Sequence, residues 1–393
     1  MRQAIELLVD AIDRADRDRG GALLAGVTEG DVYEAAVTVM MRLVFLLFAE
    51  DQRPSLFGNE PLYDAHYAVS SLIDQLQAQA DRAGEEFLER KEDAWSRLLS
   101  TFRVVHGGSD HDQMRLPAYG GSLFDPDRFA FLEGRARGSN WERDDAKPLP
   151  INNRKVLHIL EAIQFLEMRS GRFAERRRLS FRALDVEQIG HVYERLLEHT
   201  VRRAAGPVLG LTGGTKGGVR QEPEIRLADL EAWRERGDEI LLVELAKWTG
   251  RTASQLKKAL TQPLELGADT RFLVACDNDV QLWARVRPFA GLIRLDRAGR
   301  PWIVRDGGLY VTSGTDRRQS GAHYTPRSLT EPIVQHALEP LVYEGPAEGA
   351  PKESWRLRPA SALLDLKICD PAMGSGAFLV QACRYLSERL VEA

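Results

Sequence analysis

The sequence predicts a mainly α N-terminal region followed by the start of an α/β domain, in which helices cover a parallel sheet. Two observations carry this prediction. Apolar side chains over residues 1–105 recur at the 3.6-residue spacing of helices. Residues 363–390 read instead as an apolar strand, a glycine turn and a helix. In doubly wound folds, that kind of corner is where ligands bind.

Three helical segments make up the first region. AIELLVDAIDRA is amphipathic, DVYEAAVTVMMRLVFLLFAEDQ is apolar on nearly every side, and LYDAHYAVSSLIDQLQAQADRA is again one-sided. The most apolar stretch, residues 37–49, contains Arg42 and is too short to span a bilayer, so we expect a buried helix and no membrane association. The charged N-terminus does not fit a signal peptide, and the three cysteines have no paired spacing. We therefore expect a cytoplasmic protein.

The length of 393 residues allows two or more domains. We expect a helical domain over residues 1–203, a Gly-rich loop or linker over 204–224, a small α+β insertion or connector over 225–315, and the α/β domain over 316–393. The linker does not have phosphate-loop spacing, because Lys216 precedes a glycine. Within the insertion we expect a helix over 252–260 and strands over 272–276, 280–283, 302–304 and 309–311.

The glycine turn lies in DLKICDPAMGSGAFLV, residues 365–380. Leu363, Leu364, Leu366 and Ile368 predict a buried strand, and residues 377–390 predict a helix. Glycines between them permit positive φ and let a ligand approach the backbone, while Asp370 is placed to accept hydrogen bonds from a hydroxyl or ammonium group. Any tight strand-to-helix corner also favours glycine, so the glycine pair alone leaves a structural role open.

A second string, GAHYTPRSLTEPIV, occupies residues 321–334. It predicts a polar turn followed by a helix, with Pro326 in the first turn and Ser328 as a capping residue. Taken alone, Tyr324 fits an ordinary helix entrance. Its distance from Asp370 along the chain suits one helix, one loop and one strand.

Together the two strings resemble the cofactor motifs of S-adenosylmethionine-dependent adenine-N6 DNA methyltransferases, in which D-P-A-x-G-S-G-x-F-L follows G-x-[HFY]-[YF]-T-P. The resemblance implies a Rossmann-like methyltransferase domain, with S-adenosylmethionine as cofactor and Phe378 packed beneath it. It assigns the following residues to cofactor binding: His323, Tyr324, Thr325, Pro326, Asp370, Pro371, Met373, Gly374, Ser375, Gly376 and Phe378.

Three further strings resemble the helical N-terminal region of large restriction-modification methylases of type IIG and of phage-defence methylases in BREX and DISARM systems. They are FAED at 48–51, YGGSLFD at 119–125 and IGHVYERLLE at 189–198. Plain core packing accounts equally well for most of these residues. Glu194 and Glu198 would form a metal pair only with further ligands that the sequence does not show, so we predict no metal site.

Charge is distributed unevenly along the chain. Residues 1–100 hold 19 acidic and 10 basic side chains, whereas residues 171–220 hold 5 acidic and 10 basic ones. Basic side chains that neutralise phosphates supply much of the affinity of proteins for DNA, and the resemblance implies double-stranded DNA as partner. A solvated helix face would have the same composition. The candidate phosphate contacts are Arg176, Arg177, Arg178, Arg182, Arg202 and Arg203.

One element of the family is absent from residues 1–393: the string [DNS]-P-P-[YFW]. In adenine-N6 methyltransferases it hydrogen-bonds the exocyclic amine of a flipped adenine and stacks on its ring. We therefore assign no catalytic residue, and we expect an N-terminal portion of the enzyme that is inactive alone. Two alternatives remain: one half of a split methyltransferase completed by a second polypeptide, and a non-catalytic helical fragment that binds DNA or other defence-system proteins.

Overall fold

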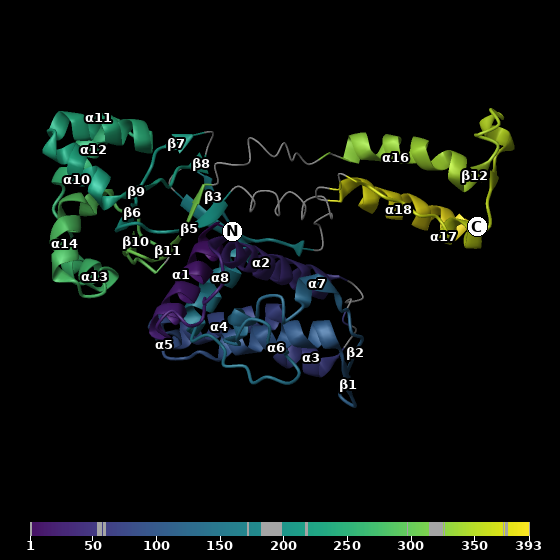
Figure 1. Ribbon diagram of the computed structural model, residues 1–393, viewed down its shortest axis with the longest axis horizontal. Coiled ribbons are helices and arrows are strands. Elements are labelled where there is room, and N and C mark those ends of the chain that lie inside the picture. Colours follow the sequence, from purple (N-terminus) through teal and green to yellow (C-terminus); the bar gives the residue numbers. More distant parts are fainter. Residues whose placement is uncertain are drawn as a thin grey trace. The chain divides into compact units, whose positions relative to one another are not determined.

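The computed structural model describes residues 2–52, 57, 60–170, 173–181, 199–216, 219–296, 298–313, 325, 327–371, 373 and 376–392. About 57% of the structure is helical, which confirms the mainly α prediction (Figure 1). All strand pairs in the described residues are antiparallel, so the expected parallel sheet is not among them. The chain forms two compact units: unit 1 is Met1–Phe181 with His199–Ser313, and unit 2 is Arg182–Glu198 with Gly314–Ala393.

The first half of unit 1 is helical, as the sequence predicts. Its elements are α1 (Arg2–Asp18), α2 (Glu29–Asp51), α3 (Pro61–His66), α4 (Val69–Ala83), α5 (Glu85–Leu88), α6 (Asp93–Gly107), β1 (Ser109–His111), β2 (Met114–Leu116), α7 (Gly121–Phe124), η1 (Ala130–Glu133) and α8 (Asn153–Gln164). Helix α2 begins at a capping box in which Thr28 and Asp31 bond each other's backbone N–H groups. It has the length and hydropathy of a membrane span, but 78% of its most apolar window is buried in unit 1. It is therefore a core helix of this unit.

The end of α2 also stabilises the start of α4. Ala68, at the N-cap position of α4, has no side chain that can cap it. The Glu50 carboxylate takes this role, accepting hydrogen bonds from the backbone N–H groups of Val69 and Ser70 at 2.8 and 2.9 Å and from the Ser70 hydroxyl at 2.7 Å. Glu50 of FAED therefore has a structural function, as the cap of α4, in addition to any role in core packing.

The second half of unit 1 mixes small sheets and helices. Its elements are β3 (Phe165–Ser170), β4 (Phe173–Arg178), β5 (His199–Arg203), β6 (Val208–Gly210), β7 (Thr215–Lys216), β8 (Val219–Arg220), β9 (Glu224–Arg226), α10 (Leu227–Glu235), α11 (Asp238–Thr249), α12 (Ala253–Thr261), α13 (Ala268–Ala275), α14 (Val280–Val286), η3 (Arg287–Leu292), β10 (Ile303–Val304) and β11 (Leu309–Ser313). The predictions for α12, β10 and β11 are confirmed. The predicted strands 272–276 and 280–283 are wrong, since both segments are helical. Asp279 caps α14 through two backbone N–H groups, and Phe272 stacks on Trp283 with ring centroids 5.0 Å apart.

The Gly-rich segment 204–224 is not a loop or linker, so that prediction is wrong. It contains β6, the central strand of the sheet β10-β6-β9, and its Leu209 and Leu211 are fully buried. A Cβ atom on Gly210 would lie 2.5 Å from the Trp302 ring, and one on Gly214 would lie 2.5 Å from the carbonyl oxygen of Gly250. Glycine occurs at these two positions because a ring or another backbone segment approaches the chain too closely for a side chain.

Unit 2 contains a pair of packed helices. Its described elements are α16 (Arg327–Val342), β12 (Tyr343–Glu344), η4 (Lys352–Ser354), β13 (Arg356–Leu357), α17 (Ala360–Leu364) and α18 (Ala377–Glu392). Its core joins α16 and α18 through buried Val334, Leu338, Ala382 and Tyr385. The predicted helices at 377–390 and after the His-Tyr-Thr-Pro tetrad are confirmed. Ser328, however, lies inside the first turn of α16 and not at its cap position.

The predicted strand through Leu363 and Ile368 is wrong in this structure. Leu363 and Leu364 belong to α17, and residues 366–370 have no regular secondary structure. Leu364 is 70% exposed and Ile368 is 39% exposed. A parallel strand needs neighbouring strands for its hydrogen bonds, and among the described residues of unit 2 only β12 and β13 pair with each other.

Candidate cofactor site

The glycine turn precedes α18 as the sequence predicts, and one of its glycines has the expected conformation. Gly376 has φ of +80°, in the region that L-residues rarely adopt, and its N–H donates a 2.8 Å hydrogen bond to the Met373 carbonyl oxygen. A Cβ atom at this position would meet only Met373 Cγ, at 3.9 Å. Glycine is therefore required here by the backbone angle and not by lack of space.

Other residues of the candidate site lie at the surface of unit 2. Met373 is 52% exposed and Pro371 is exposed, while Asp370 and Thr325 are half-buried. Pro371 and Met373 are thus open to a ligand, whereas one carboxylate oxygen of Asp370 is buried. The segment that presents Asp370 is irregular, whereas the resemblance implies the end of a strand.

Phe378 already has packing partners. It lies in the first turn of α18 and is half-buried against the hydrophobic core between α16 and α18. The resemblance implies a position beneath the cofactor, and a ring that packs on this core also supports the turn before it. Five of the assigned positions lie outside the described residues: His323, Tyr324, Pro326, Gly374 and Ser375.

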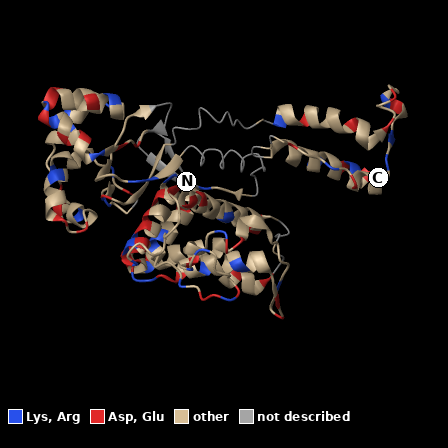
Figure 2. Ribbon diagram, viewed as in Figure 1, with Lys and Arg blue, Asp and Glu red and all other residues tan. Residues whose placement is uncertain are grey.

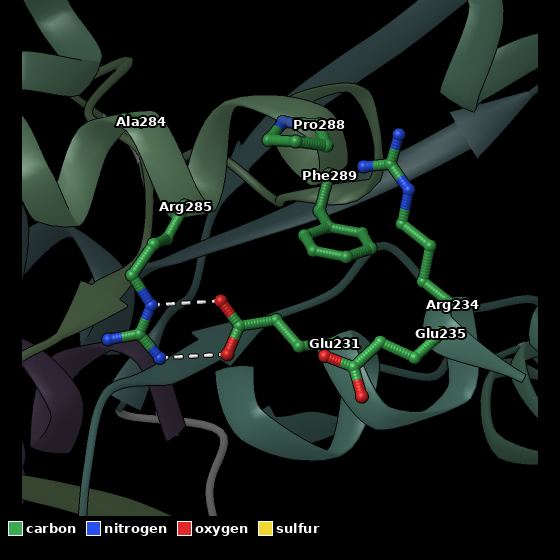
Figure 3. A pocket seen from close by; sticks show the side chains of 7 residues that line it. All are labelled: Glu231, Arg234, Glu235, Ala284, Arg285, Pro288 and Phe289. Atoms are coloured by element: carbon green, nitrogen blue, oxygen red, sulfur yellow. Dashed lines mark hydrogen bonds and ion pairs between the residues drawn. The ribbon is translucent and has the colours of Figure 1, made fainter.

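A pocket of about 500 Å³ lies in unit 1, between α10 and the segment formed by α14 and η3 (Figure 3). Arg285 forms a bidentate ion pair with Glu231, both contacts at 2.8 Å, and the Arg234 guanidinium lies 5.7 Å from the centre of the Phe289 ring. None of the residues that line this pocket belongs to the two cofactor strings. Arg285 and Glu231 neutralise each other, so this pair offers no free charge to a ligand.

Lys and Arg do not gather on one helix of unit 1 but are interspersed with Asp and Glu (Figure 2). Of the six candidate phosphate contacts, Arg182 lies outside the described residues, and for Arg176 and Arg177 only the backbone, in β4, is described. Arg178 lies 3.5 Å from a carboxylate oxygen of Asp74. The expected cluster is thus only partly visible.

Arg202 and Arg203 are adjacent in β5 but point to opposite faces of the β5–β11 pair. Arg203 lies 3.4 Å from Glu29 and donates a 2.8 Å hydrogen bond to the Gly307 carbonyl oxygen. Arg202 is exposed on the other face, opposite Tyr310 of β11. The sequence does not indicate Tyr310 as a functional residue, although the alternating pattern of its strand, LYVTS, is typical of exposure on one side.

The chain matches no protein-family model, no curated protein and no solved structure. Within the described ranges, no group of three or more His, Cys, Asp or Glu side chains is placed to hold a metal ion.

Proposed function

We propose that this chain carries the helical region and the first cofactor-binding elements of an S-adenosylmethionine-dependent adenine-N6 DNA methyltransferase with a Rossmann-like domain. The observation that carries the proposal is the order of two strings, the His-Tyr-Thr-Pro tetrad at 323–326 and Asp370–Gly376, each followed by a helix. The positive φ of Gly376 supports it, because the family motif places glycine where the backbone meets the cofactor.

The described residues fit the cofactor in part. Asp370 would accept hydrogen bonds from its ammonium or hydroxyl groups, and the turn ending at Gly376 would surround its methionine part, with Thr325 on the facing segment. When bound, S-adenosylmethionine supplies an electrophilic methyl group. The irregular residues 366–370 would become a strand only where neighbouring strands pair with them.

Adenine N6 of double-stranded DNA is the proposed methyl acceptor, in restriction-modification or phage defence. The string that would hold the flipped base is not among the 393 residues, so methyl transfer requires it from another polypeptide segment. We expect the chain alone to transfer no methyl groups to DNA. Radioactive methyl labelling of DNA by the purified chain would contradict this expectation.

Calorimetric titration with S-adenosylmethionine tests the cofactor site directly. We expect binding by the wild-type chain and at least a tenfold loss in Asp370→Ala, with no change in the matched control Asp365→Ala, an exposed carboxylate at the end of α17. Gly376→Ala should also weaken binding, because an L-residue at this φ costs roughly 1–2 kcal/mol. Equal affinity of wild type and Asp370→Ala for S-adenosylmethionine would show that this turn does not bind the cofactor through Asp370.

A further inference from the structure

Two small sheets of unit 1 form a polar surface near the end of β5. Strand β5 pairs with β11 in antiparallel register, so that Thr200 and Arg202 lie directly opposite Thr312 and Tyr310. Directly opposed residues in a sheet project to the same face. One face therefore carries all four of these polar side chains. The opposite face carries Val201 and Val311, which are buried.

Strand β9 brings a second arginine to this face. The Thr312 hydroxyl donates a 3.2 Å hydrogen bond to the Glu224 carboxylate at the start of β9. At the other end of β9, Arg226 is exposed and, two residues from Glu224, projects to the same side of the strand as that carboxylate. Burial and the Glu224 carboxylate raise the pKa of Tyr310, while Arg202 and Arg226 oppose this rise. The phenol therefore remains a hydrogen-bond donor at neutral pH.

The two arginines keep donors available for a ligand. Arg202 makes no ion pair with any residue in the described part of the chain. Arg226 uses Nε and Nη2 on Asp229, at 2.8 Å each, which holds its guanidinium plane in place. An arginine has five N–H donors, so the rest of this fork stays available. A planar fork held in this way suits phosphate oxygens.

Aromatic packing fixes the platform beneath these groups. Trp302 lies edge-to-face against Tyr310, with ring centroids 6.4 Å apart, and the Arg294 guanidinium lies 4.5 Å from the centre of the Trp302 ring. Arg294 is buried and forms an ion pair at 2.8 Å with Glu6 of α1. Tyr310 is thus supported by a rigid layer and has little freedom to turn away.

We propose that Arg202, Tyr310 and Arg226 form a contact surface for the DNA phosphate backbone. The choice of DNA as the polyanion rests on the proposed function, whereas the surface itself rests on the sheet register and the two exposed arginines. Contacts of this kind position a protein on a duplex without reading its sequence. Two residues of this surface, Tyr310 and Arg226, lie outside the basic segment 171–220 and are not among the phosphate contacts that the sequence predicts.

Fluorescence anisotropy with a labelled duplex of random sequence, titrated at several salt concentrations, tests this surface. Arg202→Ala and Arg226→Ala should each weaken binding several-fold at low salt and reduce the slope of log K against log salt by about 0.9 for each phosphate that the variant no longer neutralises. Tyr310→Phe should weaken it less, because only the hydroxyl is removed. The matched control is Arg236→Ala, an exposed arginine just beyond α10, which should bind as wild type does.

Circular dichroism of each variant shows whether it is folded, so that a loss of binding can be distinguished from a loss of structure. Wild-type affinity and salt slope in both arginine variants would overturn the surface, as would an equal loss in Arg236→Ala. S-adenosylmethionine titration of the same samples separates the two proposals. Cofactor binding without DNA binding would overturn this surface and leave the proposed function standing. DNA binding that depends on Arg202 and Arg226, without cofactor binding, would support the surface and contradict the proposed function.

Discussion

Arg42 Nε, in the middle of α2, donates a 2.6 Å hydrogen bond to the backbone carbonyl oxygen of Leu123 in α7. Its Nη2 donates a second bond, at 3.0 Å, to the carbonyl oxygen of Asp125, and the guanidinium lies 5.1 Å from the centre of the Phe102 ring. Burial lowers the pKa of Arg42 to about 10, so the side chain is still charged at neutral pH. One buried arginine thus joins α2, which ends in FAED, to the YGGSLFD segment.

We expect Arg42→Ala to lower the free energy of unfolding by about 3 kcal/mol, because it leaves two part-buried carbonyl groups unbonded and opens a cavity. Urea denaturation followed by circular dichroism measures this loss. The matched control is Arg82→Ala, an exposed arginine in the last turn of α4, which should change stability by less than about 0.5 kcal/mol. Similar stability of the two variants would show that Arg42 is not required to hold the YGGSLFD segment.

Local periodicity predicts much of unit 1. Helices α1 and α4 follow from one-sided apolar spacing, α2 follows from a long apolar run, and α12 begins at the Thr252 capping box. Strands β10 and β11 are predictable because their apolar residues alternate or lie between turn signals. The segments of α13 and α14 wrongly predict strands, since short segments rich in apolar residues fit both structures. For α14, the Asp279 cap is the local signal that favours a helix.

The remaining errors come from contacts that are distant in sequence. The close approach of Gly250 and Trp302 to the Gly-rich segment cannot be read from that segment itself. Leu366 and Ile368 are apolar and alternate as in a strand, but a strand forms only where another strand pairs with it. At the candidate site, the sequence indicates the need for glycine at 376. It cannot indicate that Thr312 of β11 bonds Glu224 of β9, because that depends on how two sheets are arranged.

Asp10 gives a prediction about pH. Its carboxylate lies 2.7 Å from Lys155 Nζ and 3.1 Å from Arg14 Nε. Burial opposes its ionisation, but the two cations outweigh that effect and lower the pKa of Asp10 to about 2. Because the folded-state pKa is below the unfolded value of about 4, the ionised carboxylate stabilises the fold above pH 4, and this contribution is lost as pH falls towards 2.

Asp10→Asn should therefore lower the free energy of unfolding at pH 7 by about 1 kcal/mol, a value reduced from the full shift because the side chain is 43% exposed. Urea unfolding of both proteins from pH 7 to pH 2.5 should show this difference shrinking below pH 4. Asp18→Asn, an exposed carboxylate at the end of the same helix, is the control. A difference that stays constant over the whole range would mean that Asp10 acts through its shape and not its charge.

The substitution Gly214→Ala tests whether the Gly-rich segment 204–224 is packed against the rest of unit 1. The Gly214 N–H donates a 2.7 Å hydrogen bond to the Thr249 carbonyl oxygen, and a Cβ atom there would lie 2.5 Å from the Gly250 carbonyl oxygen. The atoms that the new methyl group would meet belong to the backbone and have little room to move, so Gly214→Ala should destabilise unit 1 by roughly 2–3 kcal/mol in urea denaturation.

Gly30→Ala is the matched control, because Gly30 lies in the first turn of α2 and a Cβ atom there would meet only the Thr28 hydroxyl oxygen, at 3.5 Å. In a helix, replacing glycine by alanine should leave stability unchanged or raise it by up to about 1 kcal/mol. The two variants add the same methyl group and should therefore change stability in opposite directions. If Gly214→Ala were as stable as the wild type, residues 204–224 would behave as the loose linker that their composition suggests, and the sheet around β6 would have to be placed differently.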